Sequence, residues 1–254
     1  MSSPRRRMAS SGLAFVMTAA LALGFSRDAA NTVHRDAGSI RGIVRVGGSV
    51  TYTGPARTAQ PIDMGGDAYC TEANAGIRVM DEQVVLGTGS GIGNVVVYVK
   101  EGVPTGNLPV DEEPALLDQD RCLYAPRIVA MRTDQMLIIR NSDQTLHNVH
   151  VRAQNNRGFN IGQPLRGLEA RRRFPNPEVG IDVQCDVHGW MQAYVAVFEH
   201  PFFVVTSGDG RFQLSDLPPG EYVLEAWHES LGVQTQSVTV SPGTDTQVSF
   251  VFGG

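Results

Sequence analysis

The sequence is poor in cysteine and lacks the motifs through which cysteine most often binds zinc or haem. Only three cysteines occur in 254 residues: Cys70, Cys122 and Cys185. Structural zinc sites typically use closely spaced cysteine pairs, and covalent haem attachment uses C-x-x-C-H. Neither spacing is present. These absences argue against a zinc ribbon and against a covalently attached haem.

Helical periodicity is also missing. Outside the N-terminal segment, no long stretch places apolar residues at the 3.6-residue period of an amphipathic helix. Short alternating runs are instead separated by turn residues, and the chain holds 28 Gly and 14 Pro. The Gly-rich run at 87–91 lacks the Lys-Ser/Thr end of a phosphate-binding loop. We therefore predict an all-β fold in which residues 49–93 carry no clear pattern and 87–91 form a flexible loop.

The first thirty residues resemble an export signal. Arg5, Arg6 and Arg7 precede an uncharged apolar stretch at 12–25, which is short for a membrane span. The alternative is an uncleaved anchor. Removal of residues 1–30 takes away four Arg and one Asp, so the net charge changes from −5 to −8. We expect a periplasmic or secreted, acidic protein with no membrane span after cleavage and no nucleic-acid partner, because nucleic acids bind cationic surfaces.

The most informative stretch is Cys185–Met191, which presents three donor side chains as C-x2-H-x2-M, with a further donor at His147. Two imidazoles, one thiolate and a distant thioether form the ligand set of a type 1 (blue) copper site. Sulfur ligands suit Cu(I) and imidazole suits Cu(II). We predict that His147, Cys185, His188 and Met191 bind one copper ion. The alternative is a hairpin in which these side chains only pack.

These residues carry a resemblance to the cupredoxin family, and to its amicyanin-like members in particular. The matching features are Asn141-Ser142-Asp143, then His147-Asn148-Val149-His150, then the short Cys-to-Met loop. The resemblance implies a Greek-key β-sandwich or barrel over residues 115–198, with Asn148 linking the two ligand-bearing segments. It also implies that electrons leave through the ring edge of His188, exposed beside Trp190. The implied partners are a c-type cytochrome and a quinoprotein dehydrogenase.

If Cys185 is a copper thiolate, Cys70 and Cys122 remain. Export to an oxidising compartment favours a disulfide between them. The alternative is that both are buried free thiols.

Other polar groups are interpreted as structural. His150 faces away from His147 because side chains alternate along a strand. Arg171–Arg173 is interpreted as a solvated strand end, and Glu101–Asp120 as a solvated acidic linker. His228 and Glu229 are adjacent on a predicted strand and therefore cannot face one metal.

The C-terminal residues carry a second resemblance. Asp209-Gly210-Arg211-Phe212 and Leu217-Pro218-Pro219-Gly220-Glu221-Tyr222 are similar to carboxypeptidase regulatory-like domains, which are transthyretin-like β-sandwiches. Residues 38–44 and 92–98 resemble the opening strands of the same module. We therefore predict a discontinuous sandwich, 38–110 with 199–254, that contains the copper domain 115–198 as an insertion. The competing division assigns the N-terminal strands to the cupredoxin barrel.

Three classes of function follow. The ligand set favours an electron carrier over an enzyme, because the His-Cys-His run of multicopper enzymes is absent. Copper binding for delivery or storage is the second class. A secreted binding or adhesion protein, in which the sandwich contacts carbohydrate or protein, is the third.

Overall fold

The computed structural model describes residues 44–105, 108 and 113–253. Strands dominate these residues, and the only helices described are α1 (Ala68–Ala73) and the 3-10 turn η1 (Thr88–Ser90). The predicted all-β fold is confirmed. The predicted export signal at 1–30 lies outside the described residues. Within the described part, none of the helices has the length and apolar character needed to cross a membrane.

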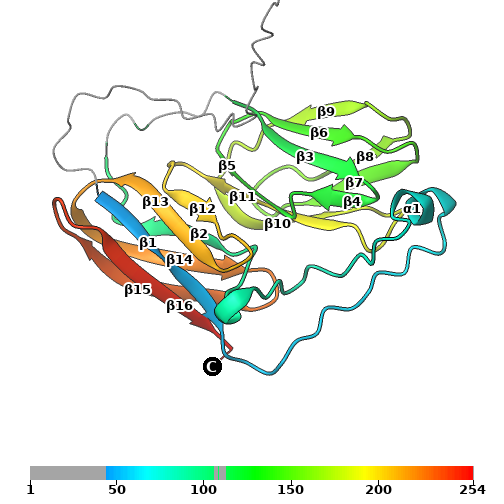
Figure 1. The fold of residues 1–254 in the computed structure, drawn as a ribbon. Coiled ribbons are helices and arrows are strands. Elements are labelled where there is room, and N and C mark those ends of the chain that lie inside the picture. The colour runs from blue at the N-terminus through cyan, green and yellow to red at the C-terminus, as the bar shows by residue number, and fades with distance from the viewer. Residues whose placement is uncertain (1–43, 106–107, 109–112, 254) are drawn as a thin grey trace, which may run out of the picture. The chain divides into compact units, whose positions relative to one another are not determined.

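Two sheets with orders β13-β1-β16 and β12-β2-β14-β15 bring N-terminal and C-terminal strands together (Figure 1). We call these seven strands the sandwich region. Strand β1 runs parallel to β16 and antiparallel to β13, and β2 lies between β12 and β14. Their bounds are β1 Val44–Tyr52, β2 Val96–Glu101, β12 Phe203–Val205, β13 Arg211–Leu217, β14 Gly220–His228, β15 Gly232–Val240 and β16 Thr246–Phe252. The division into domains stays a prediction.

The nine strands between β2 and β12 form two further sheets, with orders β5-β11-β10-β7-β8 and β4-β3-β6-β9. We call them the site region. Their bounds are β3 Ala115–Asp120, β4 Leu123–Ala125, β5 Ile128–Arg132, β6 Leu137–Asn141, β7 His147–Arg152, β8 Phe159–Gln163, β9 Glu169–Arg172, β10 Glu178–Gln184 and β11 Gln192–Phe198. The linker predicted over Glu101–Asp120 is wrong for its last six residues. They form β3, where alternation buries Leu117 and Gln119.

Strand β2 is apolar on both faces because each face packs against a different cluster of side chains. Val97 and Val99 belong to the core of the sandwich region. Val96 and Tyr98 point the other way and pack with Ile128 and residues of β11. A strand buried on both faces needs an unbroken apolar run rather than an alternating one. The sandwich region therefore packs directly against the site region.

The segment from β1 to β2 is ordered, contrary to its unpatterned sequence. It extends from the sandwich region to α1, which lies beside the sheet of the site region (Figure 1). The Gly-rich run predicted as a flexible loop is the turn η1. A Cβ at Gly91 would lie 1.9 Å from the Asp209 carbonyl oxygen, and one at Gly87 would lie 2.1 Å from that of Gly208. These glycines allow two backbone segments to approach closely.

Candidate metal centre

His147, the first residue of β7, is completely buried (0% exposed). Its Nε2 lies 2.9 Å from Asp143 Oδ2, and its Nδ1 lies 2.9 Å from Nδ1 of His188. Asp143 is acceptor-only when ionised, so it requires a proton on Nε2 of His147. In the neutral ring the lone pair of Nδ1 is thereby directed at His188.

Asp143 is itself held by several donors. Its Oδ2 accepts the backbone N–H of Cys122 and its Oδ1 that of Arg121, both at 2.7 Å. The Tyr69 hydroxyl donates to Oδ1 at 3.1 Å. Arg121 and Cys122 both have positive φ, 54° and 59°, which places them in a tight turn after β3. A buried carboxylate with this many donors stays ionised and fixed in position.

Cys185 and Met191 close the hairpin between β10 and β11. The backbone N–H of Cys185 donates to the Met191 carbonyl at 3.2 Å, and that of Met191 donates to the His188 carbonyl at 2.9 Å. The His188 N–H donates to the Cys185 sulfur at 3.4 Å. All three side chains are buried. The short loop therefore turns them inward together.

Asn148 connects β7 to this loop. Its side-chain oxygen accepts the backbone N–H of Asp186 at 2.6 Å and that of Val187 at 3.3 Å. The Cys185 sulfur lies 3.4 Å from the same oxygen. Asn148 lies next to His147 on β7 and contacts the loop that begins with Cys185. It thus links the two segments that carry the predicted ligands.

The structure brings together three of the four predicted ligands through their donor atoms. His147, Cys185 and His188 each offer one atom, and these atoms lie within 4.8 Å of one another. Met191, 1% exposed, packs in the same core cluster as Cys185. Assignment of the four side chains as copper ligands stays a prediction.

The electrostatics favour a cation among these atoms. Burial by itself lowers the pKa of His147, but the hydrogen bond to Asp143 and the nearby Cys185 together raise it to about 9. Burial raises the pKa of the Cys185 thiol, yet His147 and the surrounding amide groups lower it overall. Two imidazole nitrogens 2.9 Å apart beside a sulfur need a proton or a metal ion between them. The donor set and its charge therefore fit copper.

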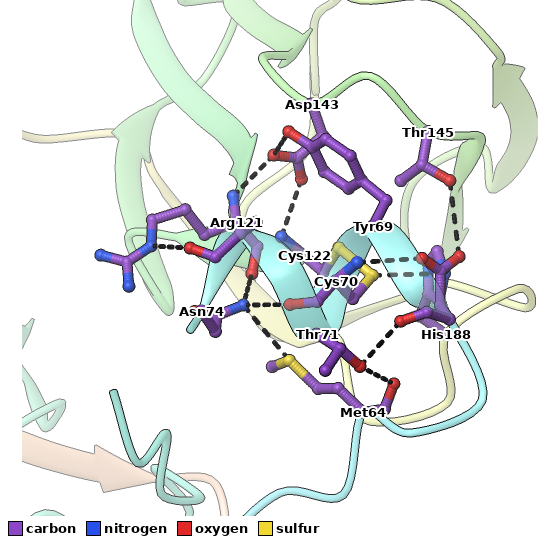
Figure 2. The surroundings of a disulfide bond; sticks show 12 residues. Met64, Tyr69, Cys70, Thr71, Asn74, Arg121, Cys122, Asp143, Thr145 and His188 are labelled. Carbon is purple, nitrogen blue, oxygen red and sulfur yellow. Dashed lines mark hydrogen bonds and ion pairs between the residues drawn. A yellow bond between two sulfur atoms is a disulfide. The ribbon is translucent and has the colours of Figure 1, made fainter. Parts of the chain in front are cut away.

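The predicted surface position of His188 is wrong. The side chain is 2% exposed, and its Nε2 lies 3.1 Å from Asp67 Oδ2 and 3.7 Å from Cys70 Sγ. Figure 2 shows His188 beside helix α1, next to the disulfide. The ring edge expected at the surface is covered because the segment between β1 and β2 folds over the site.

The cover depends on residues that the sequence interpretation missed. Asp67 is the N-cap of α1 and accepts the Cys70 backbone N–H at 2.9 Å. An aspartate three residues before Cys70 is an N-cap pattern. A helix of only six residues is too short to show a period, however. Nothing in the sequence around Asp67 indicates that it lies next to His188, which is 121 residues away.

Cys70 and Cys122 form a disulfide with an S–S distance of 2.05 Å and a Cα–Cα distance of 5.5 Å. Cys185 is a free, buried thiol. The disulfide attaches α1 to the turn that donates to Asp143 (Figure 2).

Trp190, the second residue predicted at the electron-transfer surface, is half-buried. Its ring centroid lies 5.0 Å from that of His188, and its indole N–H donates to the Cys122 carbonyl at 2.9 Å. Trp190 also lines a groove together with Tyr124, Met80 and Met191. It therefore contacts His188 on one side and an open groove on the other.

The remaining histidines occupy structural positions. His150 Nδ1 lies 3.0 Å from Asp186 Oδ1, away from the three donor atoms. His228 is buried in the sandwich region, while Glu229 pairs with Arg127 at 2.6 Å. Of the arginines at 171–173, Arg171 and Arg173 are exposed.

Comparison with known proteins gives one family match. Residues 191–253 match the family described as Carboxypeptidase regulatory-like domain, which confirms the resemblance of the C-terminal strands. The match begins at Met191 and so includes β11, although β11 pairs with β5 and β10 of the site region. No curated protein matches the chain.

Several solved copper proteins are similar in structure to part of the chain. An oxidised amicyanin mutant is 17% identical, with 40% of this chain and 97% of that chain covered and a TM-score of 0.31. A purple cupredoxin from Nitrosopumilus maritimus is 21% identical, with coverages of 33% and 98% and a TM-score of 0.28. A copper-containing nitrite reductase from Thermus scotoductus SA-01 is 17% identical, with coverages of 39% and 25% and a TM-score of 0.33. This chain spans about a quarter of that nitrite reductase.

Proposed function

We propose that this chain is an exported type 1 copper protein that carries single electrons between redox partners. The observation that carries the proposal is the buried convergence of one ring nitrogen each of His147 and His188 with Cys185 Sγ, all within 4.8 Å of one another. Copper bound to these atoms would supply a one-electron couple. His147, Cys185 and His188 would be the strong ligands and Met191 the weak axial one.

The surrounding residues prepare these donors. Asp143 orients the ring of His147, and Asn148 holds the start of the loop. The lowered pKa of Cys185 favours the thiolate, which is the form that binds metal. Burial on a rigid hairpin and strand restricts movement of the ligands between oxidation states.

Electron exit is assigned to Trp190 rather than to the edge of His188. Trp190 has its ring against His188 and also lines an open groove. The proposed partners are a c-type cytochrome and a quinoprotein dehydrogenase. Weak redox encounters bury less than about 1,200 Å². A small contact between the partner and this groove is therefore enough for electron transfer.

Copper loading tests the ligand set. Purified protein mixed with one equivalent of Cu(II) is expected to become intensely blue, because a thiolate-to-copper transition requires Cys185. Cys185→Ser should abolish the colour. His150→Gln, which changes a histidine outside the three-atom cluster, should retain it. A colourless copper complex of the wild-type chain, or full colour in Cys185→Ser, would refute the proposed site.

Stopped-flow mixing with a c-type cytochrome tests the exit. Trp190→Ala should slow electron transfer at least several-fold and leave the blue colour largely intact, whereas Trp190→Phe keeps the ring contact and should slow it less. With a basic cytochrome, the rate should fall as salt is added, because salt screens the attraction between that cytochrome and the acidic mature chain. An unchanged rate in Trp190→Ala would place the exit elsewhere.

The cover over His188 favours a second candidate, copper binding without electron transfer. A site closed by α1 retains its metal and offers no histidine edge to a partner. Blue copper that exchanges no electrons with any cytochrome or dehydrogenase would select this candidate.

A further inference from the structure

Asp67 makes two different contacts with its two carboxylate oxygens. Oδ1 accepts the Cys70 N–H at 2.9 Å and so caps α1, whereas Oδ2 lies 3.1 Å from His188 Nε2. Thr145 Oγ1 is 3.5 Å from the same Oδ2. The carboxylate therefore joins a helix start to a predicted ligand that lies 121 residues away in the chain.

Helix α1 is attached firmly enough to hold Asp67 in this place. The disulfide ties Cys70 to Cys122. The Asn74 side-chain amide donates to the Arg121 carbonyl at 2.9 Å, and the Tyr69 hydroxyl donates to Asp143. Figure 2 shows these contacts around one short helix. Each contact joins α1 to the turn after β3 or to the carboxylate that orients His147.

Neutral imidazole carries one N–H and one lone pair, and the partner of one nitrogen decides which nitrogen has the proton. A carboxylate that only accepts selects the N–H form at the nitrogen it faces. At His188 that nitrogen is Nε2. The lone pair is then left on Nδ1, which faces His147 Nδ1 at 2.9 Å and the Cys185 sulfur at 3.9 Å.

We propose that Asp67 is a positioning residue of the metal centre, which holds His188 with its proton on Nε2 and the lone pair of Nδ1 directed at the shared site. This inference rests on the proposed function for its metal-binding consequence. Asp143 makes the equivalent contact with His147, so each predicted imidazole ligand has its own carboxylate. Carboxylates that orient metal-bound histidines in this way typically contribute 10–100-fold to metal affinity.

The substitution Asp67→Asn isolates this role. Asparagine keeps an oxygen that caps the helix, but it places an N–H donor where Oδ2 accepted. It should therefore favour the tautomer of His188 with the proton on Nδ1, which must be displaced before metal binds. Asp67→Ser also keeps a capping oxygen and is too short to reach His188. Asp63→Asn is the matched control, because Asp63 is exposed on the same segment and, among the described residues, accepts the Gly65 N–H alone.

Two measurements are made on each variant. Histidine nitrogen NMR of the metal-free protein should show Nε2 of His188 protonated in the wild type and in Asp63→Asn, and unprotonated in Asp67→Asn. Competition of Cu(II) with a chelator of known affinity should show weakening by about 10–100-fold in Asp67→Asn. Asp67→Ser should weaken binding as well, and Asp63→Asn should not.

Protonated Nε2 in Asp67→Asn together with Cu(II) affinity within twofold of the wild type would overturn the positioning role. If wild-type protein binds no copper while the tautomer change still occurs, the proposed function fails and the control of His188 by Asp67 stands. The NMR result and the copper result therefore separate the two proposals.

Discussion

His147 in the site region and His228 in the sandwich region are equally buried, at 0% and 1% exposure, yet their protonation is shifted in opposite directions. The pKa of His147 is raised to about 9 because Asp143 and Cys185 outweigh the effect of burial. The pKa of His228 is lowered to about 4, first by burial and then by the positive charges of Arg127 and Arg57. Burial alone therefore does not indicate the function of a histidine.

Partners distinguish the two environments. Both ring nitrogens of His147 face groups that can share a proton or a cation. In His228, Nδ1 accepts the Ser230 N–H at 3.1 Å, and among the described residues Nε2 has no hydrogen-bond partner. The site region places a buried carboxylate and a sulfur beside His147, whereas His228 packs with no acidic hydrogen-bond partner among the described residues. Metal binding requires the first arrangement, and packing requires the second.

The substitution with the largest expected effect tests whether the contact between the site region and the sandwich region stabilises the protein. Arg127 of the site region and Glu229 after β14 form a buried ion pair, with side-chain exposures of 8% and 3%. Glu229→Leu leaves the Arg127 charge buried and unpaired, so the free energy of unfolding should fall by about 3–5 kcal/mol. Chemical denaturation measures this change.

The exposed pair Arg140–Glu169 is the matched control, and Glu169→Leu should cost no more than about 1 kcal/mol. Equal effects of the two substitutions would show that the contact between the regions adds no stability.

The disulfide sharpens the comparison from within the site region. Replacing both Cys70 and Cys122 by Ala removes a cross-link over a separation of 52 residues. It should lower the free energy of unfolding by roughly 3–4 kcal/mol, because the unfolded chain gains conformational freedom. Non-reducing peptide mapping of the wild type should find these two cysteines joined and Cys185 unlinked. A stability unchanged by the double substitution would contradict the role given to the disulfide.

The smallest expected effect concerns pH and the sandwich region. His228 has an ordinary pKa of 6.5 when unfolded and about 4 when folded. Its contribution to stability is fully present above pH 6.5 and is lost as the pH falls from 6.5 towards 4, because only the unfolded state takes up the proton. The difference between these two pKa values corresponds to about 3 kcal/mol of stability. Denaturation of wild type and His228→Gln at pH 7 and pH 4 measures this loss.

The wild type should lose about 3 kcal/mol more than the variant over this range, since other titrating groups are common to both. A parallel pH dependence of the two proteins would mean that His228 is protonated in the folded state.

The sequence by itself determined the local features. Alternating runs and turn residues specify strands such as β14 and β16, because the two-residue period depends only on neighbouring residues. The C-x2-H-x2-M spacing places Cys185 and His188 in one short hairpin, which forces their side chains close together. Strand parity likewise separated His147 from His150, and His150 contacts Asp186 away from the cluster.

Only the tertiary structure decided what surrounds these residues. Asp67 reaches His188 across 121 residues, and Tyr69 reaches Asp143 across 74. No periodic pattern in the sequence predicts such contacts. They arise because the largely irregular segment between β1 and β2 packs against the sheets of the site region. The sequence thus determined which side chains could bind a metal ion. Long-range packing decided that His188 would be buried under α1 and oriented by a carboxylate.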